Sequence, residues 1–323
     1  MRFILSFALA SVLLSSTLYG LILAVDPYNK FGYNLFNFET KAVDFARQNK
    51  YIQVEHSKKD YTAFIMGTSS AHRYETKELN RLTGLVSYNY STQSATPEDY
   101  IAMTRHILTK YKPKLIMIAF GFEELSTTTK TDDMFYSSPL KNFLNEVPAE
   151  ELKTDLFNNS YLTLEAIADS FKVIWVNVFG KALHSYLEDG YHIIEPLPKT
   201  LKISQFGYIN FELDYKRIGY LKTLKDLCDK NGVKVVVFTS PLSIEHLNKM
   251  MSDEKLSKAH ELYLSTLVDI FGEVWDFHRS EIATFNSLQY FRDSNHPTHE
   301  FSTIIMEEMF SGQPPKIGKL VKK

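Results

Sequence analysis

The chain has 323 residues, of which 44% are hydrophobic and 14% aromatic, and its 36 basic residues nearly balance its 38 acidic ones. A formal net charge of −2 gives no basic footprint for nucleic acid and no strong attraction to anionic lipid, so the sequence predicts neither as an electrostatic partner. Cys228 is the single cysteine, so no intramolecular disulfide can form, and without an accompanying Cys/His pattern we expect a buried thiol rather than a nucleophile.

The chain begins with an uncharged apolar segment at residues 3–25. This segment is long enough to cross a bilayer, since a helix rises about 1.5 Å per residue. A cleaved secretory signal normally has an apolar region of only about 7 to 15 residues before a small-x-small cleavage site, and no strong Ala-x-Ala site follows here. We therefore expect residues 1–25 to form an uncleaved transmembrane signal anchor, with a cleaved signal peptide as the alternative.

The charges that flank this segment do not settle its orientation. Arg2 and the terminal amine precede it, and Lys30, Lys41 and Arg47 follow it. A short head before the span and one large domain after it are typical of a signal anchor, which places residues 26–323 outside the cytoplasm. We expect residues 26–60 to form a juxtamembrane connector that contains a helix.

Residues 61–323 contain five apolar runs of β-type composition, and helical patterns separate most of them. This alternation predicts an α/β domain with a doubly wound sheet of about five parallel strands. The expected strands are 61–66, 86–90, 115–120, 233–239 and 273–277, and the clearest expected helices are 97–110, 215–230, 256–271 and 300–309.

An insertion at about residues 125–212 interrupts the alternation. It contains a helical pattern at 161–178, in which Glu165, Asp169 and Lys172 exclude a second simple membrane span. We expect this helix to cover the sheet; the alternatives are a lid over the site or a helix on the membrane surface.

Two short segments near opposite ends of the domain contain the side chains of a serine hydrolase. Ser69 follows an apolar run and Gly67, where a sharp turn can lift a hydroxyl above the end of a strand. Asp293 precedes His296 by three residues, so its carboxylate can bind one imidazole nitrogen and leave the other for the serine. We expect Ser69, rather than the adjacent Ser70, to be the nucleophile, His296 its base and Asp293 the orienting carboxylate; in the alternative reading Ser69 only caps a helix.

At these residues the sequence resembles the SGNH, or GDSL-like, hydrolase superfamily. Gly67-Thr-Ser69 stands where that family has its Gly-Asp-Ser block, and Asp293-Ser-Asn-His296 matches its closing Asp-x-x-His block. The resemblance implies an SGNH-like, flavodoxin-like fold over most of residues 60–312 and catalysis through an acyl-serine intermediate.

Two further blocks of that family are degenerate here. Ser94 stands where the second block has glycine, and Gly121-Phe-Glu-Glu124 replaces the usual Gly-x-Asn-Asp, whose asparagine donates to the oxyanion. A backbone N–H survives the first exchange, but a carboxylate cannot donate unless it is protonated. The resemblance therefore implies a reduced oxyanion hole formed by the amides of Ser69 and Ser94.

Three more side chains are expected to bind substrate. His72 and Arg73 follow the nucleophile by one turn, where Arg offers bidentate contact to an anion, although both are also compatible with a solvated helix start. Glu123 is expected to bind a substrate hydroxyl or to be protonated; the alternative is an exposed loop acid. The histidines show no His-x3-His pair or linked carboxylate set, so we expect no metal and no cofactor.

The anchor narrows what the resemblance implies about function. The chain is similar to membrane-tethered SGNH-like proteins of bacterial envelopes, such as those of alginate and peptidoglycan O-acetylation. This implies a single-pass protein of the inner or cytoplasmic membrane whose domain faces the periplasm or the outside. We expect a serine esterase or O-acyltransferase acting on acyl, chiefly acetyl, esters of an envelope polysaccharide, with a membrane acyl-donor protein as partner. The alternative is a catalytically silent domain that binds a polymer or partner during envelope assembly.

Overall fold

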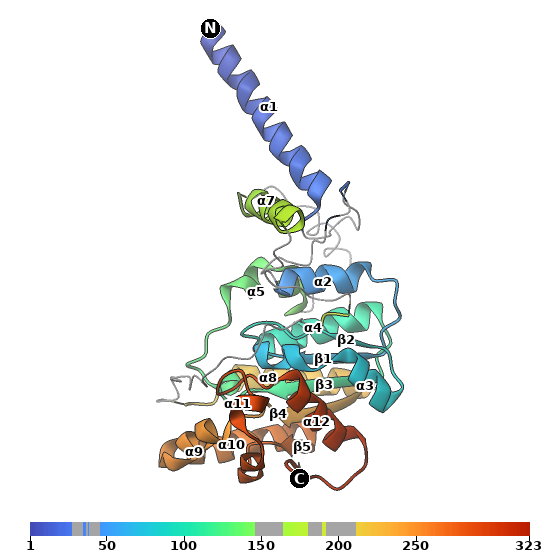
Figure 1. The fold of residues 1–323 in the computed structure, drawn as a ribbon, viewed down its shortest axis with the longest axis vertical. Coiled ribbons are helices and arrows are strands. Elements are labelled where there is room, and N and C mark those ends of the chain that lie inside the picture. Colours follow the sequence, from blue (N-terminus) through green and yellow to red (C-terminus); the bar gives the residue numbers. More distant parts are fainter. Residues whose placement is uncertain (28–34, 37, 39–45, 146–163, 180–188, 192–210) are drawn as a thin grey trace.

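The computed structural model describes residues 1–27, 35–36, 38, 46–145, 164–179, 189–191 and 211–323. Its first helix, α1 (Arg2–Val25), projects away from the body of the protein, and α7 (Leu164–Phe179) and α2 (Ala46–His56) lie between α1 and the sheet (Figure 1). Helix α1 is long and apolar enough to cross a membrane.

The body is built on a six-stranded sheet in the order β2-β1-β3-β4-β5-β6. The first five strands in this order pair in parallel, as the sequence predicts, and β6 pairs antiparallel to β5. β1 and β3 are buried along their whole length, because helices cover both faces of a parallel sheet and leave no polar side to alternate with. The strands are β1 (Ala63–Gly67), β2 (Ser87–Asn89), β3 (Leu115–Phe120), β4 (Lys234–Thr239), β5 (Glu273–Asp276) and β6 (Lys319–Lys322).

Helices on the two faces of the sheet follow from right-handed crossovers, which take the chain over one face from β1 to β2 and back over the other to β3. α3 (Thr76–Thr83) packs against α12 (His299–Phe310) on the first face. On the second face α8 (Tyr215–Lys230) packs against α4 (Pro97–Lys110) and α10 (Glu254–Phe271), so these three helices form a row. The four clearest predicted helices are present as α4, α8, α10 and α12. Successive strands are added on one side of β1 and then on the other, so the strand order switches between β1 and β3, and an open parallel sheet usually binds its ligands at such a switch point.

Shorter elements connect these layers. The 3-10 turns are η1 (Ser69–Arg73), η2 (Phe122–Leu125), η3 (Pro139–Phe143) and η5 (Ser280–Thr284), and the remaining short helices are α5 (Asp133–Ser137), α9 (Ile244–Ser252) and α11 (Ser287–Tyr290).

The connector helix α2 is part of the body rather than a free linker. Its side chains Tyr51, Ile52 and Val54 are buried in the core. The ammonium group of Lys50, fully buried, donates to Asn89 O at 2.9 Å and to Ser91 O at 2.7 Å, which are carbonyls at the carboxyl end of β2. The connector therefore satisfies backbone groups beside the end of the sheet where the site forms.

The inserted helix α7 differs from expectation. The sequence analysis placed the helix at 161–178 over the sheet, but the structure packs α7 against α1, on the far side of α2 from the sheet (Figure 1). Residues 161–163 lie outside the described part of the chain. The periodicity of a helix shows which residues share a face but not what that face contacts. The prediction that this helix covers the sheet was wrong for that reason.

Candidate active site

Ser69 lies just beyond the carboxyl end of β1, and Gly67 allows the sharp turn that places it there. Gly67 has φ +153°, and a Cβ added there would lie 2.5 Å from the Cβ of Ala71 and 3.0 Å from Ala119 O. Only glycine therefore lets η1 start directly above the strand end. Ser69 is the first residue of η1, is partly exposed, and has its Oγ 2.7 Å from Nε2 of His296.

Asp293 and His296 share a tight turn between α11 and α12. The turn is closed by a backbone hydrogen bond from Arg292 N to His296 O at 2.9 Å. Asp293 Oδ1 accepts the backbone N–H groups of Asn295 at 3.1 Å and His296 at 3.0 Å. His296 Nδ1 lies 2.8 Å from Oδ1 and 2.9 Å from Oδ2 of Asp293. The backbone therefore fixes the carboxylate, and the carboxylate fixes the imidazole.

The electrostatics of this turn favour an ionised carboxylate. Burial alone would raise the pKa of Asp293, but its hydrogen bond to His296, the charge of that ring and the two backbone N–H groups outweigh burial, so the pKa lies below its usual value. An ionised Asp293 accepts a hydrogen bond from the N–H at Nδ1 and leaves Nε2 of His296 as the acceptor facing Ser69. The structure thus brings the three predicted residues into one hydrogen-bonded chain.

The neighbouring Ser70 faces the interior. Its Oγ accepts a hydrogen bond from Ser240 Oγ at 2.8 Å and lies 3.2 Å from Thr68 Oγ1, and the residue is buried. No described contact joins Ser70 to His296. The geometry therefore agrees with the expectation that Ser69, not Ser70, is placed to react.

The loop that carries Ser94 continues β2 beside the end of β1. Thr92 N donates to Gly67 O at 3.1 Å, which holds this loop next to the turn of the serine. Ser94 is exposed and has φ +50°, a left-handed conformation that glycine adopts more easily. The SGNH pattern has glycine at this position, and the left-handed backbone conformation explains why glycine suits it.

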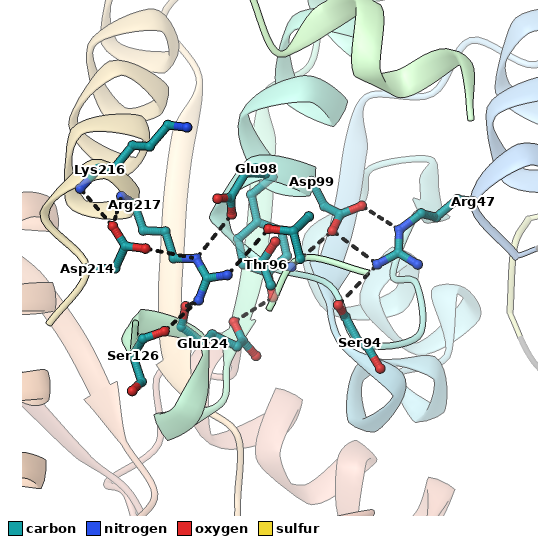
Figure 2. Close-up of polar contacts among 12 residues, drawn as sticks. Arg47, Ser94, Thr96, Glu98, Asp99, Glu124, Ser126, Asp214, Lys216 and Arg217 are labelled. Carbon is teal, nitrogen blue, oxygen red and sulfur yellow. Dashed lines mark hydrogen bonds and ion pairs between the residues drawn. The ribbon is translucent and has the colours of Figure 1, made fainter. Parts of the chain in front are cut away.

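A buried arginine from α2 holds the Ser94 loop (Figure 2). Arg47 donates to Ser94 O at 3.1 Å and to both carboxylate oxygens of Asp99, through Nε at 2.7 Å and Nη2 at 3.2 Å. Asp99 also accepts the backbone N–H of Thr96 at 3.0 Å at the start of α4. Sequence reasoning missed Arg47 because its partners lie 47 and 52 residues further along the chain.

A second buried arginine holds the loop after β3 (Figure 2). Arg217 of α8 donates to Glu124 O at 3.0 Å, to Ser126 O at 2.8 Å and to the Glu98 carboxylate at 3.2 Å. The Glu124 carboxylate accepts the N–H of Gly121 and the hydroxyl of Tyr100, each at 2.7 Å. The last glutamate of this block is therefore used inside the fold, and burial raises its pKa well above the usual value.

Glu123 is half-buried at the start of η2 and lies within electrostatic range of the triad. Burial raises its pKa above the usual value, although a hydrogen bond from its own N–H and the charge of His296 oppose the shift. A raised pKa favours the protonated acid, which can donate a hydrogen bond where the ionised form cannot. The alternative of an exposed loop acid is therefore not what the structure shows, whereas binding of a substrate hydroxyl by Glu123 stays a prediction.

His72 and Arg73 occupy the same turn as Ser69 but are both buried, with exposed fractions of 4% and 6%. They are not solvated residues of a helix start. Their role in substrate binding stays a prediction, and access would require a path through the packed turn. Cys228 is fully buried in α8, and burial raises the pKa of its thiol to about 12, as expected for a core thiol.

Three side chains that the sequence analysis did not connect lie beside the carboxyl ends of β4 and β5. The ligand-type atoms of His260, Asp276 and His278 lie within 4.8 Å of one another. His278 Nε2 donates to Ser240 O at 2.7 Å, and its Nδ1 lies 2.9 Å from Nε2 of His260. Burial lowers the pKa of His260 to about 3 and of His278 to about 4, so both rings are neutral.

This trio offers the donor atoms that a transition-metal ion would need, although the hydrogen bonds just described also satisfy both nitrogens of His278 and Nε2 of His260 without one. A search for His-x3-His spacing missed it, because one ligand comes from α10 and the other two flank the end of β5.

A scan against protein-family models finds no match for this chain, and a search of curated proteins finds none.

Proposed function

We propose that this chain is a membrane-anchored serine esterase or O-acyltransferase that acts on acyl esters of a cell-envelope polysaccharide. One observation carries the proposal: the continuous chain from Ser69 Oγ through His296 to Asp293, with separations of 2.7 and 2.8 Å. A serine near neutral pH becomes a nucleophile when a base takes its proton, and this arrangement supplies the base and its orienting carboxylate.

The reaction follows from the positions of these atoms. Ser69 Oγ attacks the ester carbonyl while its proton passes to Nε2 of His296. The bond to the leaving alcohol then breaks, that alcohol takes the proton from Nε2, and the acyl group stays on Ser69. In the second half, water or a sugar hydroxyl gives its proton to Nε2 and attacks the acyl-serine, which releases an acid or a new ester and restores the serine.

The tetrahedral intermediates need donors for the developing negative charge. We assign the backbone amides of Ser69 and Ser94 to this role, on the loops that lie side by side at the ends of β1 and β2. The protonated form of Glu123 supplies a further donor in place of the asparagine of the SGNH pattern, and its raised pKa supports this role. Losing one such donor typically costs about 3 to 4 kcal/mol of transition-state stabilisation, so this acid matters to the rate.

The substrate class rests on α1 and on the resemblance of the two motifs to SGNH-like envelope proteins. Helix α1 meets the length and hydropathy of a single membrane span, which supports a domain tethered to a membrane. We place the domain on the outer side of the bacterial inner or cytoplasmic membrane because the resemblance to envelope proteins and the short head before the span imply it. A tethered domain meets polymers at the membrane surface, and a membrane protein that delivers the acyl group would meet the same site.

A second function has one observation in its favour. The block after β3 has no amide donor of the kind that an SGNH oxyanion hole uses, and Glu124 is bound inside the fold. A silent domain that binds a polymer or partner during envelope assembly would tolerate this change without loss.

Labelling of the purified full chain with a fluorophosphonate, which reacts with activated serines, separates the two functions. We expect labelling of the wild type, none of Ser69→Ala or His296→Ala, and retained labelling of Ser70→Ala. Thermal melting of each variant controls for the fold. Labelling that persists in Ser69→Ala but is lost in Ser70→Ala would overturn the nucleophile, and an unlabelled wild type would favour the silent domain.

A further inference from the structure

Helix α7 presents an apolar stripe to the outside of the protein. The stripe consists of residues spaced alternately four and three apart, so all of them lie along one side of the helix. Its large side chains have exposed fractions between 56% and 87%. The stripe residues are Leu164, Ala168, Phe171, Trp175 and Val178, with Phe179 beside the last.

The opposite side of α7 is packed and contains the polar groups. Ala166, Ser170 and Val173 are fully buried. Asp169 is also buried, and Lys172 is half-buried. A helix on a water-exposed surface turns its charges outward and its apolar residues inward. The exposed side chains of α7 that the structure describes are apolar, and its described charged residues, Asp169 and Lys172, are buried or half-buried. Exposure of this face to water is therefore unfavourable.

The position of α7 indicates which solvent fits. It packs against α1 at the end that joins the body of the protein (Figure 1). Within α1, burial is confined to the last turn at Ile22 and Val25, and the preceding turns expose apolar side chains as a membrane span does. The stripe of α7 therefore begins where the apolar surface of α1 ends, next to the plane at which the span leaves the bilayer.

We propose that α7 is a membrane-surface helix that inserts the stripe Leu164 to Phe179 into the bilayer interface at the foot of α1. The occupant of this face is lipid: the headgroup boundary and the first part of the acyl chains. Trp175 belongs to the stripe, and its ring contacts that of Phe179 in a tilted arrangement, with ring centroids 4.2 Å apart. Tryptophan prefers this boundary, and an apolar helix face in the interface plane is the usual form of such contacts.

This inference rests on the proposed insertion of α1 but not on the proposed catalysis. It gives the anchored domain two attachments to the membrane instead of one. A single span leaves the domain free to swivel about its connector, whereas a span together with an interfacial helix fixes one side of the domain toward the lipid.

The two tryptophans of the chain allow a direct test. Trp275→Phe leaves Trp175 as the only indole, and Trp175→Phe leaves only Trp275, which lies in β5 within the body. A third protein, Leu13→Trp in a background with Trp175→Phe and Trp275→Phe, places the only indole in the middle of α1. Each full chain is reconstituted singly into phosphatidylcholine–phosphatidylglycerol nanodiscs with or without brominated acyl chains, which quench nearby indoles.

We expect brominated lipid to remove about half or more of the emission of Trp175 and of the α1 indole, and to leave Trp275 unchanged. If the α1 indole is quenched and Trp175 is not, the inference about α7 is wrong while the anchor stands. If neither is quenched, α1 does not insert and the inference falls with it. A Trp175 that is shielded from aqueous acrylamide but not quenched by bromine would mean that protein, such as a second copy, covers the stripe. Fluorophosphonate labelling of Ser69 in the same samples reports on catalysis independently.

Discussion

Replacement of Asp293 by asparagine tests the triad most sharply, because the structure determines how the new amide must lie. In the wild type, Oδ1 of Asp293 accepts two backbone N–H groups, from Asn295 and from His296. An asparagine keeps its oxygen on those donors and therefore turns its NH2 group toward Nδ1 of His296, at the place where Oδ2 lay 2.9 Å away. The asparagine oxygen stays 2.8 Å from Nδ1 and competes with this donor; we expect the donor to prevail, so that the ring carries its proton on Nε2.

The size of the effect follows from this reversed tautomer. Nε2 would then point a hydrogen at Ser69 Oγ, 2.7 Å away, and would have no lone pair to take the serine proton. The same inversion in a serine protease lowers turnover by about 10⁴-fold, which corresponds to about 5.4 kcal/mol at 1.36 kcal/mol per tenfold. We expect a loss of that order at neutral pH, with substrate affinity unchanged.

Turnover of p-nitrophenyl acetate by the full chain in detergent measures this loss. Asp253→Asn is the matched control, since Asp253 also accepts backbone N–H groups, at the start of α10, and asparagine caps helices equally well. Turnover of Asp293→Asn within about tenfold of the wild type would refute the tautomer argument.

The same substitution has a stability signature. The pKa of Asp293 is lower in the folded protein than in the unfolded chain, where it is about 4. Ionisation of Asp293 therefore stabilises the fold above that pH, and this stabilisation is lost as the pH falls through the folded pKa. We expect the melting temperature of the wild type to exceed that of Asp293→Asn at neutral pH, and the gap to close in acid. A gap that stays constant with pH would mean that the charge of the carboxylate does not contribute.

Three further outcomes are expected. Glu123→Asn should raise esterase turnover, most of all at alkaline pH, because the wild-type acid ionises there and can no longer donate a hydrogen bond. Unchanged or lower turnover at every pH would assign Glu123 to another role, such as binding an acceptor hydroxyl. Gly67→Ala should lower the free energy of unfolding by about 1 to 3 kcal/mol through its clash with Ala71. In the same chemical denaturation, Gly84→Ala, at φ +69° with open space around it, reports the cost of a positive φ without a clash. An alkaline phosphatase fused after Lys323 should be active in cells, and an inactive fusion beside an active cytoplasmic reporter would overturn the topology.

The parallel strands were predictable because burial on both faces leaves unbroken apolar runs, as in β1 and β3. β6 was missed, since its short Lys-Leu-Val-Lys segment is flanked by charge and pairs only at the edge of the sheet. The start of α10 was placed two residues late because Asp253, not the first apolar residue, sets the helix start by accepting its N–H groups.

The triad could be predicted because each half is a local motif. Asp293 and His296 lie on one turn, and Ser69 directly follows the glycine that its strand end requires. The supporting arginines could not be predicted in this way. Arg47 and Arg217 reach loops far away in the sequence, and no local pattern states which buried carbonyl a distant guanidinium will meet.

The contacts of α2 determine where the domain can be severed from its anchor. Arg47 and Lys50 both belong to α2, and between them they neutralise Asp99 and bind the carbonyls of Ser94, Asn89 and Ser91. A protease that cleaves before residue 46 separates the domain from α1 with this support intact. If a cut after α2 let this helix leave with the anchor, it would instead remove both cations at once, leave the Asp99 carboxylate buried without its arginine, and free the Ser94 loop from Arg47. Loss of the span and inactivation would then be one and the same event.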